Sequence, residues 1–202
     1  MDSGAFTEIS THGRYRHSVE AYAAEINQWA SDPGLLAAVA QDYMCEPFIL
    51  EKTGLTVDDH QRLTIERYDA LRRASSVPVI PVLQGYTVAD YLRHLEAYGA
   101  RIEAGAWVGV GSICKRNSSP AEIEMILQAI RRRRPDMRLH GFGLKISALA
   151  EGSVRDALHS ADSMAWSYSA RRDGRNQHDW KAAARFVDRI RRQPVQLSLG
   201  LA

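Results

Sequence analysis

Short apolar segments alternate with amphipathic helical segments along this 202-residue chain, and no other feature of the sequence constrains its fold as strongly. The apolar runs are continuous, which is typical of strands that helices cover. They span residues 35–41, 77–85, 106–112, 138–143 and 162–167. Strand and helix in turn at this spacing predict parallel βα units. The predicted fold class is therefore α/β, either a βα barrel of the TIM type or an open parallel sheet flanked by helices.

The helical segments carry N-terminal capping signals. Ser18 precedes an apolar stripe of helical period, and Thr56 with Asp59 and Thr87 with Asp90 have the spacing of a capping box. Further candidates for helix starts are Ser119 with Pro120 and Glu122, Ser153 with Asp156, and Asn176 with Asp179. These signals predict a helix after nearly every strand.

Polar residues and glycines gather where the predicted strands end. The positions are Asp42, Gln84, Gly85, Gly109, Gly111, Ser112 and Lys145, with Asp162 at the start of the last run. Carboxyl ends of parallel strands meet at one edge of a sheet, where ligands bind in α/β folds. Glycine also lets a ligand approach the backbone closely. The alternative is a set of ordinary βα turns, in which Gly and Asp are common.

Composition excludes several classes of protein. Two cysteines are too few for a disulfide scaffold, and no apolar run is long enough to span a bilayer. We therefore expect a cytoplasmic protein without a membrane segment. The net charge is only +2, but cations crowd the last quarter of the chain. Candidates for phosphate contacts there are Arg171, Arg172, Arg175 and Lys181. A solvated helix face is the other explanation of this cluster.

Six stretches occur in an order that resembles the tRNA-guanine transglycosylase superfamily. They are DSGAF at 2–6, QDYMCEP at 41–47, PVLQGYTVADY at 81–91, GVGSICKR at 109–116, LHGFGLK at 139–145 and SADSMAWSYSARR at 160–172. The likeness is strongest to the DpdA-type branch, the deazapurine DNA modification proteins. It covers the chain from Asp2 to about Arg172, and the ordered set is more specific than any one stretch.

The resemblance implies roles for particular residues. Asp162 would be the carboxylate nucleophile and Asp2 the second catalytic aspartate, with Ser3 and Gly4 beside it. Asp42 would read the purine, and the base pocket would be lined by Gln84, Gly85, Gly109, Gly111 and Ser112. A carboxylate nucleophile divides base exchange into two easier steps, and a second carboxylate moves protons. The implied activity replaces guanine in a nucleic acid, DNA in preference to tRNA, with a 7-deazaguanine such as preQ0.

The chain also departs from the superfamily. Strands that normally precede the DSG motif are absent, so we expect a βα barrel that begins midway and is incomplete. No cysteine follows Cys114, and we expect neither the zinc site of the tRNA enzymes nor any cofactor. Residues 1–172 would form the barrel portion, and residues 173–202 a basic helix and tail packed on the same domain. A homodimer is one way to cover exposed strand edges.

Two other functions stay open at this stage. One is an N-glycosidase or ribosyltransferase that acts on free purine or deazapurine nucleosides or nucleotides. The other is an inactive binding or assembly module. Some residues also have two explanations: Cys45 borders the base pocket or packs in the core, Lys145 meets a phosphate or is solvated, and His140 contacts substrate or is a satisfied strand-end histidine.

Overall fold

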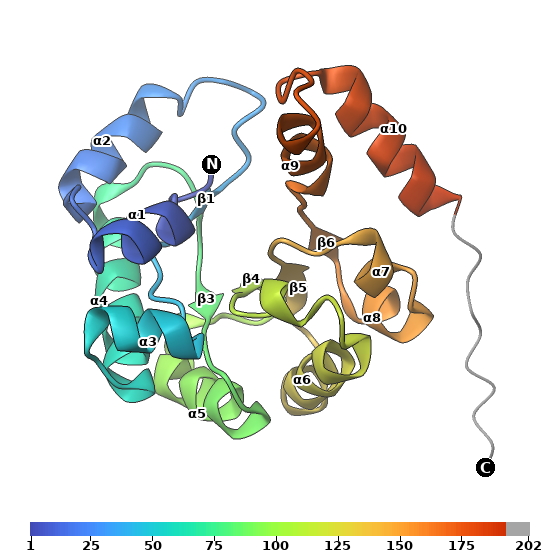
Figure 1. Ribbon diagram of the computed structural model, residues 1–202. Helices are drawn as coiled ribbons and strands as arrows, with labels where there is room; N and C mark the ends of the chain where they lie inside the picture. Colours follow the sequence, from blue (N-terminus) through green and yellow to red (C-terminus); the bar gives the residue numbers. More distant parts are fainter. Residues whose placement is uncertain (193–202) are drawn as a thin grey trace, which may run out of the picture.

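The computed structural model describes residues 1–192 and has an α/β architecture with two parallel sheets. In the smaller sheet β1 (Ala38–Val39) pairs with β2 (Val79–Ile80). The larger sheet has the order β3 (Val82–Leu83), β4 (Trp107–Val110), β5 (Arg138–Gly141) and β6 (Ser160–Ala161). Figure 1 shows the helices arranged around these strands. The predicted parallel α/β class is confirmed.

The helices follow the strands in the expected alternation. Those longer than a single turn are α1 (Ala5–His12), α2 (Val19–Gln28), α3 (Pro47–Thr53), α4 (Val57–Ala74), α5 (Val88–Tyr98), α6 (Pro120–Arg133), α8 (Gly152–Ala157), α9 (Ala165–Arg172) and α10 (Trp180–Arg191). Short helical turns are η1 (Gly99–Arg101), η2 (Cys114–Arg116) and α7 (Ile146–Leu149).

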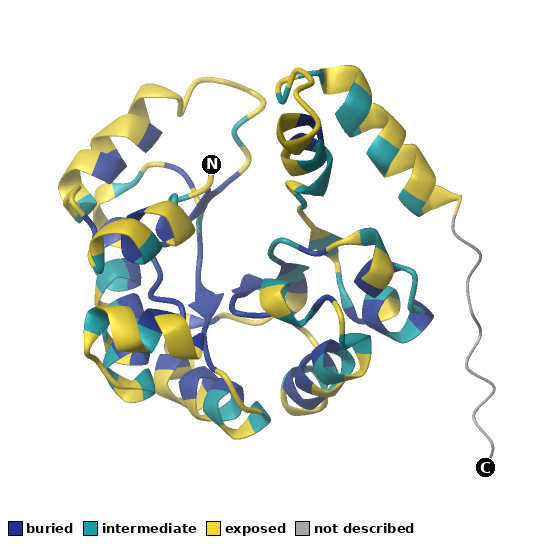
Figure 2. Cartoon of the chain, in the orientation of Figure 1, coloured by how far each residue is buried: buried dark blue, intermediate teal, exposed yellow. Residues whose placement is uncertain are grey.

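The main core lies between the larger sheet and the helices α5 and α6. Val108, Val110 and Leu139 of β4 and β5 are buried there, together with the inner stripes of both helices. In Figure 2 β3 and most of β4 are dark blue, whereas β6 and much of α10 are not buried. Ile190 of α10 nevertheless packs against this core, so the C-terminal helix rests on the same body.

The capping signals were predictive where a side chain closes the first turn. Ser18 accepts a hydrogen bond from the N–H of Ala21, and capping boxes form at Thr56 and Thr87. Ser119 is the N-cap of α6 and Pro120 its first residue, as predicted, but the capping box does not form: Ser119 makes no side-chain cap, and Arg116 binds Glu122 at 2.6 Å. Two predicted caps were wrong. The cap of α8 is Glu151 rather than Ser153, and Asp179, not Asn176, caps α10.

The strands are shorter than predicted. Pro81 separates β2 from β3 because proline has no N–H to donate to a ladder. The last predicted strand, residues 162–167, is wrong: β6 ends at Ala161, and α9 begins at Ala165. A short apolar run cannot be distinguished from a helical stripe by periodicity alone.

The N-terminal residue lies beside the smaller sheet. The Met1 amino group donates to the carbonyl of Ala37 at 2.7 Å, and the N–H of Val39 donates to the carbonyl of Met1 at 2.9 Å. Asp2 therefore lies at the same edge as the end of β1. Gly4 then adopts a φ of 69° at the start of α1, a conformation that favours glycine. Within residues 1–192, no helix has the length and apolar character that a membrane crossing needs.

Candidate active site

Asp42, Gln84 and Ser112 meet at the carboxyl ends of the strands, as the sequence predicted. All three are buried, with exposed fractions of 6%, 0% and 5%. The side-chain amide of Gln84 donates to Asp42 Oδ2, and Ser112 Oγ lies 2.7 Å from Gln84 Oε1. Three elements far apart in sequence thus contribute to one polar cluster. Its members satisfy one another in the absence of a ligand.

The backbone of Gln84 is fixed from two helices. His94 Nδ1 accepts the Gln84 N–H at 2.8 Å, and Gln61 Nε2 donates to the Gln84 carbonyl at 2.7 Å. Burial lowers the pKa of His94 to about 4, so its ring is neutral near pH 7 and Nδ1 is free to accept. α4 and α5 therefore hold the residue that binds Asp42.

Three of the predicted pocket glycines, Gly85, Gly109 and Gly111, are closely packed against other residues of this protein. A Cβ on Gly111 would overlap the Gln84 side chain, and a Cβ on Gly109 would overlap the Phe142 ring. At Gly85 a Cβ would lie 2.7 Å from Asp90 Cβ, so this glycine permits close packing of α5. Ser112 has a φ of 54°, the one non-glycine residue among residues 1–192 with a positive φ. Such backbone strain concentrates at functional sites.

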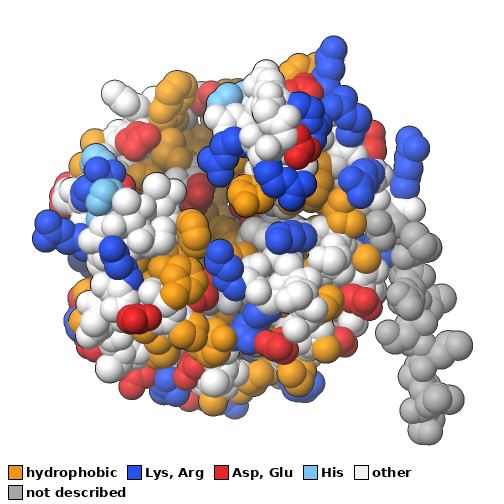
Figure 3. Space-filling view, in the orientation of Figure 1, with side chains coloured by type: hydrophobic (Ala, Val, Ile, Leu, Met, Phe, Trp, Pro, Cys, Tyr) orange, Lys and Arg blue, Asp and Glu red, His pale blue; other side chains and the backbone are white. Residues whose placement is uncertain are grey.

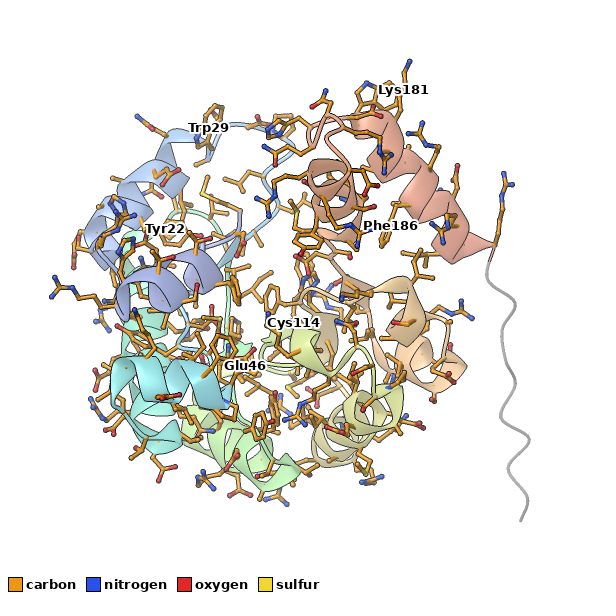
Figure 4. The ribbon with its side chains drawn as sticks, viewed as in Figure 1. Tyr22, Trp29, Glu46, Cys114, Lys181 and Phe186 are labelled. Carbon is orange, nitrogen blue, oxygen red and sulfur yellow. The ribbon has the colours of Figure 1, made fainter. Side chains whose placement is uncertain are left out.

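A fourth polar residue, Glu46, belongs to this cluster and was missed in the sequence. Its exposed fraction is 2%, and its Oε2 lies 2.8 Å from Ser112 Oγ. Its Oε1 lies 3.9 Å from Cys114 Sγ, and Figure 4 shows Glu46 and Cys114 side by side near the centre of the molecule. Within residues 1–192, no Lys or Arg comes within ion-pair distance of Glu46 or Asp42. The signal that could have found it is an acidic residue next to a predicted pocket residue.

Hydrogen counting restricts the charge of this cluster. The Ser112 oxygen accepts the N–H of Cys45 at 2.8 Å, and its single proton cannot serve both Gln84 and Glu46. If the proton points to Gln84, a protonated Glu46 must donate to Ser112. If it points to Glu46, the Gln84 amide is reversed and a protonated Asp42 must donate to it. Each complete arrangement leaves one carboxyl group protonated.

The electrostatics of Asp42 agree with this count. Burial raises the pKa of Asp42 to about 7; the bond from Gln84 opposes the rise, and the negative charges of Asp2 and Glu46 add to it. A carboxyl group of this kind gains or loses its proton near neutral pH. It can present either an acceptor or a donor to the edge of a bound base.

Asp162 occupies a different environment. Its Oδ1 accepts the N–H of Gly143 at 2.5 Å and lies 3.9 Å from His140 Nε2. Its side chain is 50% exposed. A half-exposed, hydrogen-bonded carboxylate is accessible to substrate, as a nucleophile must be. Gly143 has a φ of 65°, which turns its N–H toward this carboxylate.

His140 connects Asp162 to Asp2. Burial lowers the pKa of His140, while the charges of Asp162 and Asp2 both act to raise it. Its other ring nitrogen lies 2.9 Å from Ser160 Oγ. The two predicted catalytic aspartates therefore lie close enough to one histidine for both charges to reach it. The sequence left His140 between two explanations, and the structure places it among the candidate catalytic groups.

Asp2, Ser3 and Gly4 line a cavity of about 280 Å³ together with Tyr22 and Gln41. Asp42 and Gln84 do not line it, because the polar cluster is closed. Ser3 Oγ is buried and has no hydrogen-bond partner within the described residues. On the face seen in Figure 3, hydrophobic and cationic side chains border a hollow. Asp2 is thus available to a ligand at the cavity.

The two cysteines are thiols rather than reactive thiolates. Burial raises the pKa of both Cys45 and Cys114. Cys45 is fully buried, and its backbone N–H binds Ser112. The side chain of Cys45 therefore packs in the core, while its backbone N–H supports the polar cluster. Both explanations that the sequence left open apply to this residue.

Lys145 and Arg175 lie away from the polar cluster, in a second cavity of about 490 Å³ between α7, α9 and α10. Arg185 and Arg189 line the same cavity. Arg171, Arg172 and Lys181 are exposed; in Figure 4, Lys181 projects outward from the start of α10 while Phe186 faces the body of the molecule. The structure brings Lys145 together with Arg175, Arg185 and Arg189, whereas the predicted phosphate contacts Arg171, Arg172 and Lys181 do not line this cavity.

The largest cavity, about 750 Å³, lies at the opposite edge of the sheets. It is lined by residues at or before the starts of strands, among them Pro78, Val79, Trp107 and Arg138. Ligands of parallel α/β folds bind at the carboxyl ends of the strands. The candidate active site is therefore the smaller, polar region around Asp2, Asp42 and Asp162.

Within residues 1–192, no group of three His, Cys, Asp or Glu side chains is arranged to hold a metal ion.

The comparison with curated proteins finds no match. The comparison with protein families finds DpdA, described as DeoxyPurine in DNA protein A, over residues 1–193. The match covers nearly the whole sequence, and the chain belongs to the DpdA family.

Proposed function

We propose that this chain is a base-exchange glycosyltransferase that replaces guanine in DNA with a 7-deazaguanine such as preQ0. Membership of the DpdA family implies a transferase-type role in deazapurine modification of DNA. The observation that carries the finer proposal is the buried cluster of Asp42, Gln84 and Ser112 at the carboxyl ends of the strands. The half-exposed Asp162 and the cavity-lining Asp2 lie at the same edge. Two carboxylates next to a base-reading site suit exchange at a sugar carbon.

In the first step an Asp162 oxygen attacks C1′ of the target nucleotide. Oδ2 is the available atom because Oδ1 binds the N–H of Gly143. The C1′–N9 bond breaks, its electron pair stays on the base, and Asp2 donates a proton to the departing guanine. His140 lies 3.9 Å from Asp162 Oδ1 and helps to orient the carboxylate. The product is an aspartyl–sugar ester.

In the second step the ester is exchanged for a new glycosidic bond. Asp2, now a carboxylate, accepts the N9 proton of the incoming deazaguanine. The N9 atom attacks C1′ and releases Asp162. Each attack inverts the configuration at C1′, so the two attacks together retain the configuration of the sugar.

Asp42, Gln84 and Ser112 would read the base. An ionised Asp42 accepts hydrogen bonds from the ring N–H and the exocyclic amine of a guanine-type base, while the Gln84 amide and a backbone N–H near Ser112 bind its carbonyl. Base binding must open the existing bond between Gln84 and Asp42. A purine that lacks these donors leaves the buried carboxylate unpaired and is rejected.

The architecture is also part of the proposal. Parallel strands with helices around them support a portion of a βα barrel over residues 1–172, and the contact of Ile190 with the core supports a C-terminal helix packed on the same domain. Residues 193–202 of the predicted tail lie outside the described residues. A homodimer that covers a sheet edge is testable by sedimentation.

The test is incorporation of radiolabelled preQ0 or guanine into duplex DNA. We expect label in polymer with the wild-type chain and none with Asp162→Asn, which retains the side-chain shape and loses the nucleophile. Asp173→Asn, which changes an exposed aspartate outside the site, is the matched control and should retain exchange.

A covalent protein–DNA adduct that survives denaturation should form in the absence of an incoming base and be missing in Asp162→Asn. Full exchange by Asp162→Asn would refute the mechanism. Release of guanine from free nucleosides without incorporation into polymer would favour a nucleoside hydrolase.

A further inference from the structure

Large apolar side chains are exposed just after several strand ends of the site. Phe6, Phe48, Tyr86 and Tyr168 follow Asp2, Asp42, Gln84 and Asp162 in the sequence and have exposed fractions between 42% and 60%. We call these four rings the aromatic rim. Contiguous exposed apolar surface on a soluble protein marks an interaction site.

Each ring of the aromatic rim has a cation beside it. Lys115 Nζ lies 4.9 Å from the centre of the Phe6 ring and 5.7 Å from that of Phe48, so it connects α1 with α3. Arg171 lies 5.7 Å from the centre of the Tyr168 ring. Lys115 and Arg171 are exposed, and neither has a carboxylate within ion-pair distance in the described part of the chain. Both remain available to an anion.

Arg116 has a different role. Its guanidinium lies 4.3 Å from the centre of the Tyr86 ring, donates to the Tyr86 carbonyl, and is paired with Glu122 at 2.6 Å. Its side chain is only 12% exposed. Arg116 therefore holds the Tyr86 ring in place, and the ring remains 42% exposed.

We propose that the aromatic rim and its two exposed cations bind an unstacked stretch of DNA on either side of the target nucleotide. This proposal rests on the function above. Asp42, Gln84 and Ser112 are so deeply buried that a base stacked in a duplex cannot reach them, and such a base must leave the helix. When the target base leaves the helix, the bases on either side of it lose a stacking partner. Exposed rings provide them with a replacement stacking surface, and Lys115 and Arg171 meet the phosphates.

Binding by fluorescence anisotropy tests this proposal without base exchange. The probes are one labelled DNA sequence as a single strand, as a duplex, and as a duplex with a short unpaired bubble around a guanine. We expect the bubble and the single strand to bind more tightly than the duplex. Tyr86→Ala and Phe48→Ala should each weaken bubble binding by about 5- to 150-fold, the range for loss of one stacked base.

Matched variants separate stacking from other effects. Tyr86→Phe and Phe48→Tyr retain the rings and should bind as the wild type does. Trp29→Ala removes an equally exposed ring at the end of α2, outside the rim, and should have no effect. Lys115→Gln should reduce the slope of log K against log salt concentration by about one, as expected for the loss of one phosphate contact.

Equal affinity for duplex and bubble, or wild-type binding by Tyr86→Ala and Phe48→Ala, would overturn the proposal. So would a change of sedimentation coefficient in these variants, because the rim would then join two copies of the chain. Rim-dependent bubble binding by a protein that never incorporates a labelled base would refute base exchange and leave the rim proposal standing.

Discussion

Replacing Glu46 with glutamine should lower the pKa of Asp42. In the hydrogen-bonded cluster one proton is shared between the two carboxyl groups through Ser112 and Gln84. A neutral glutamine side chain at this position donates or accepts as Ser112 requires and carries no charge. Asp42 then no longer has to hold the shared proton, and the repulsion from Glu46 is gone.

The magnitude follows from the coupling of the pair. The pKa of Asp42 is about 7, so about half of these groups are ionised at pH 7. The charge of Glu46 is a smaller cause of this elevation than burial or the charge of Asp2, so we expect a fall of less than about one pK unit. One unit corresponds to about 1.4 kcal/mol. The remaining elevation reflects burial, the largest cause, and the charge of Asp2.

Carbon-13 NMR of carboxyl-labelled aspartate and glutamate measures these titrations in the unliganded protein. Other titratable groups near Asp42 and Glu46 must be followed or controlled, namely Asp2, Tyr15, Tyr22, Cys45, Tyr91, Tyr98 and Cys114. The matched control is Glu51→Gln, an exposed glutamate on α3.

A further variant tests the connection itself. Ser112→Ala interrupts the hydrogen-bonded link and should reduce the effect of Glu46→Gln on the pKa of Asp42. An Asp42 titration that is unchanged in Glu46→Gln would refute the shared proton.

Three other predictions concern stability. Asp42→Asn should abolish base exchange and raise the free energy of unfolding above pH 7, on the order of 4 kcal/mol by chemical denaturation, because the raised pKa of Asp42 makes its ionisation destabilising as pH rises from 3.8 through 7. The pH dependence of stability that His94 contributes has the opposite sign. Its lowered pKa should remove about 3 kcal/mol from the free energy of unfolding as pH falls from 6.5 to 4, and His94→Gln should flatten this part of the stability profile. Gly111→Ala should destabilise by about 1–3 kcal/mol and disturb Gln84, and an unchanged unfolding midpoint would contradict the close contact.

Helix starts were predictable from the sequence where the cap is local. Thr56 and Thr87 reach a partner three residues away, so their capping boxes depend on no distant part of the chain. Ser119 is the N-cap as predicted but forms no capping box, and Glu122, the residue that should have closed the box, is paired with Arg116 from the preceding turn. Strand length was not predictable, because pairing with other strands decides how much of an apolar run joins a ladder.

The site was predictable only in part for a similar reason. Parallel strand order places Asp42, Gln84 and Ser112 at one edge, and that much follows from the sequence. Glu46 lies at the start of α3 and joins the cluster through Ser112, a residue 66 positions away. Its position next to the predicted pocket residue Cys45 points to the site, but no local pattern predicts the contact with Ser112. Lys145 illustrates the converse, because its strand-end position was correct but its side chain lies in the cavity beside α10.

Burial is what separates the roles of three aspartates that the sequence places at the same edge. Asp42 is almost fully buried, and its raised pKa suits a group that exchanges hydrogen bonds with a neutral base. Asp162 is half exposed and accepts a hydrogen bond from one backbone N–H, which suits an accessible nucleophile. Asp2 is exposed beside a cavity, where it can exchange protons with an entering or departing base. Under the proposed mechanism, these different surroundings would suit identical side chains to base reading, nucleophilic attack and proton transfer.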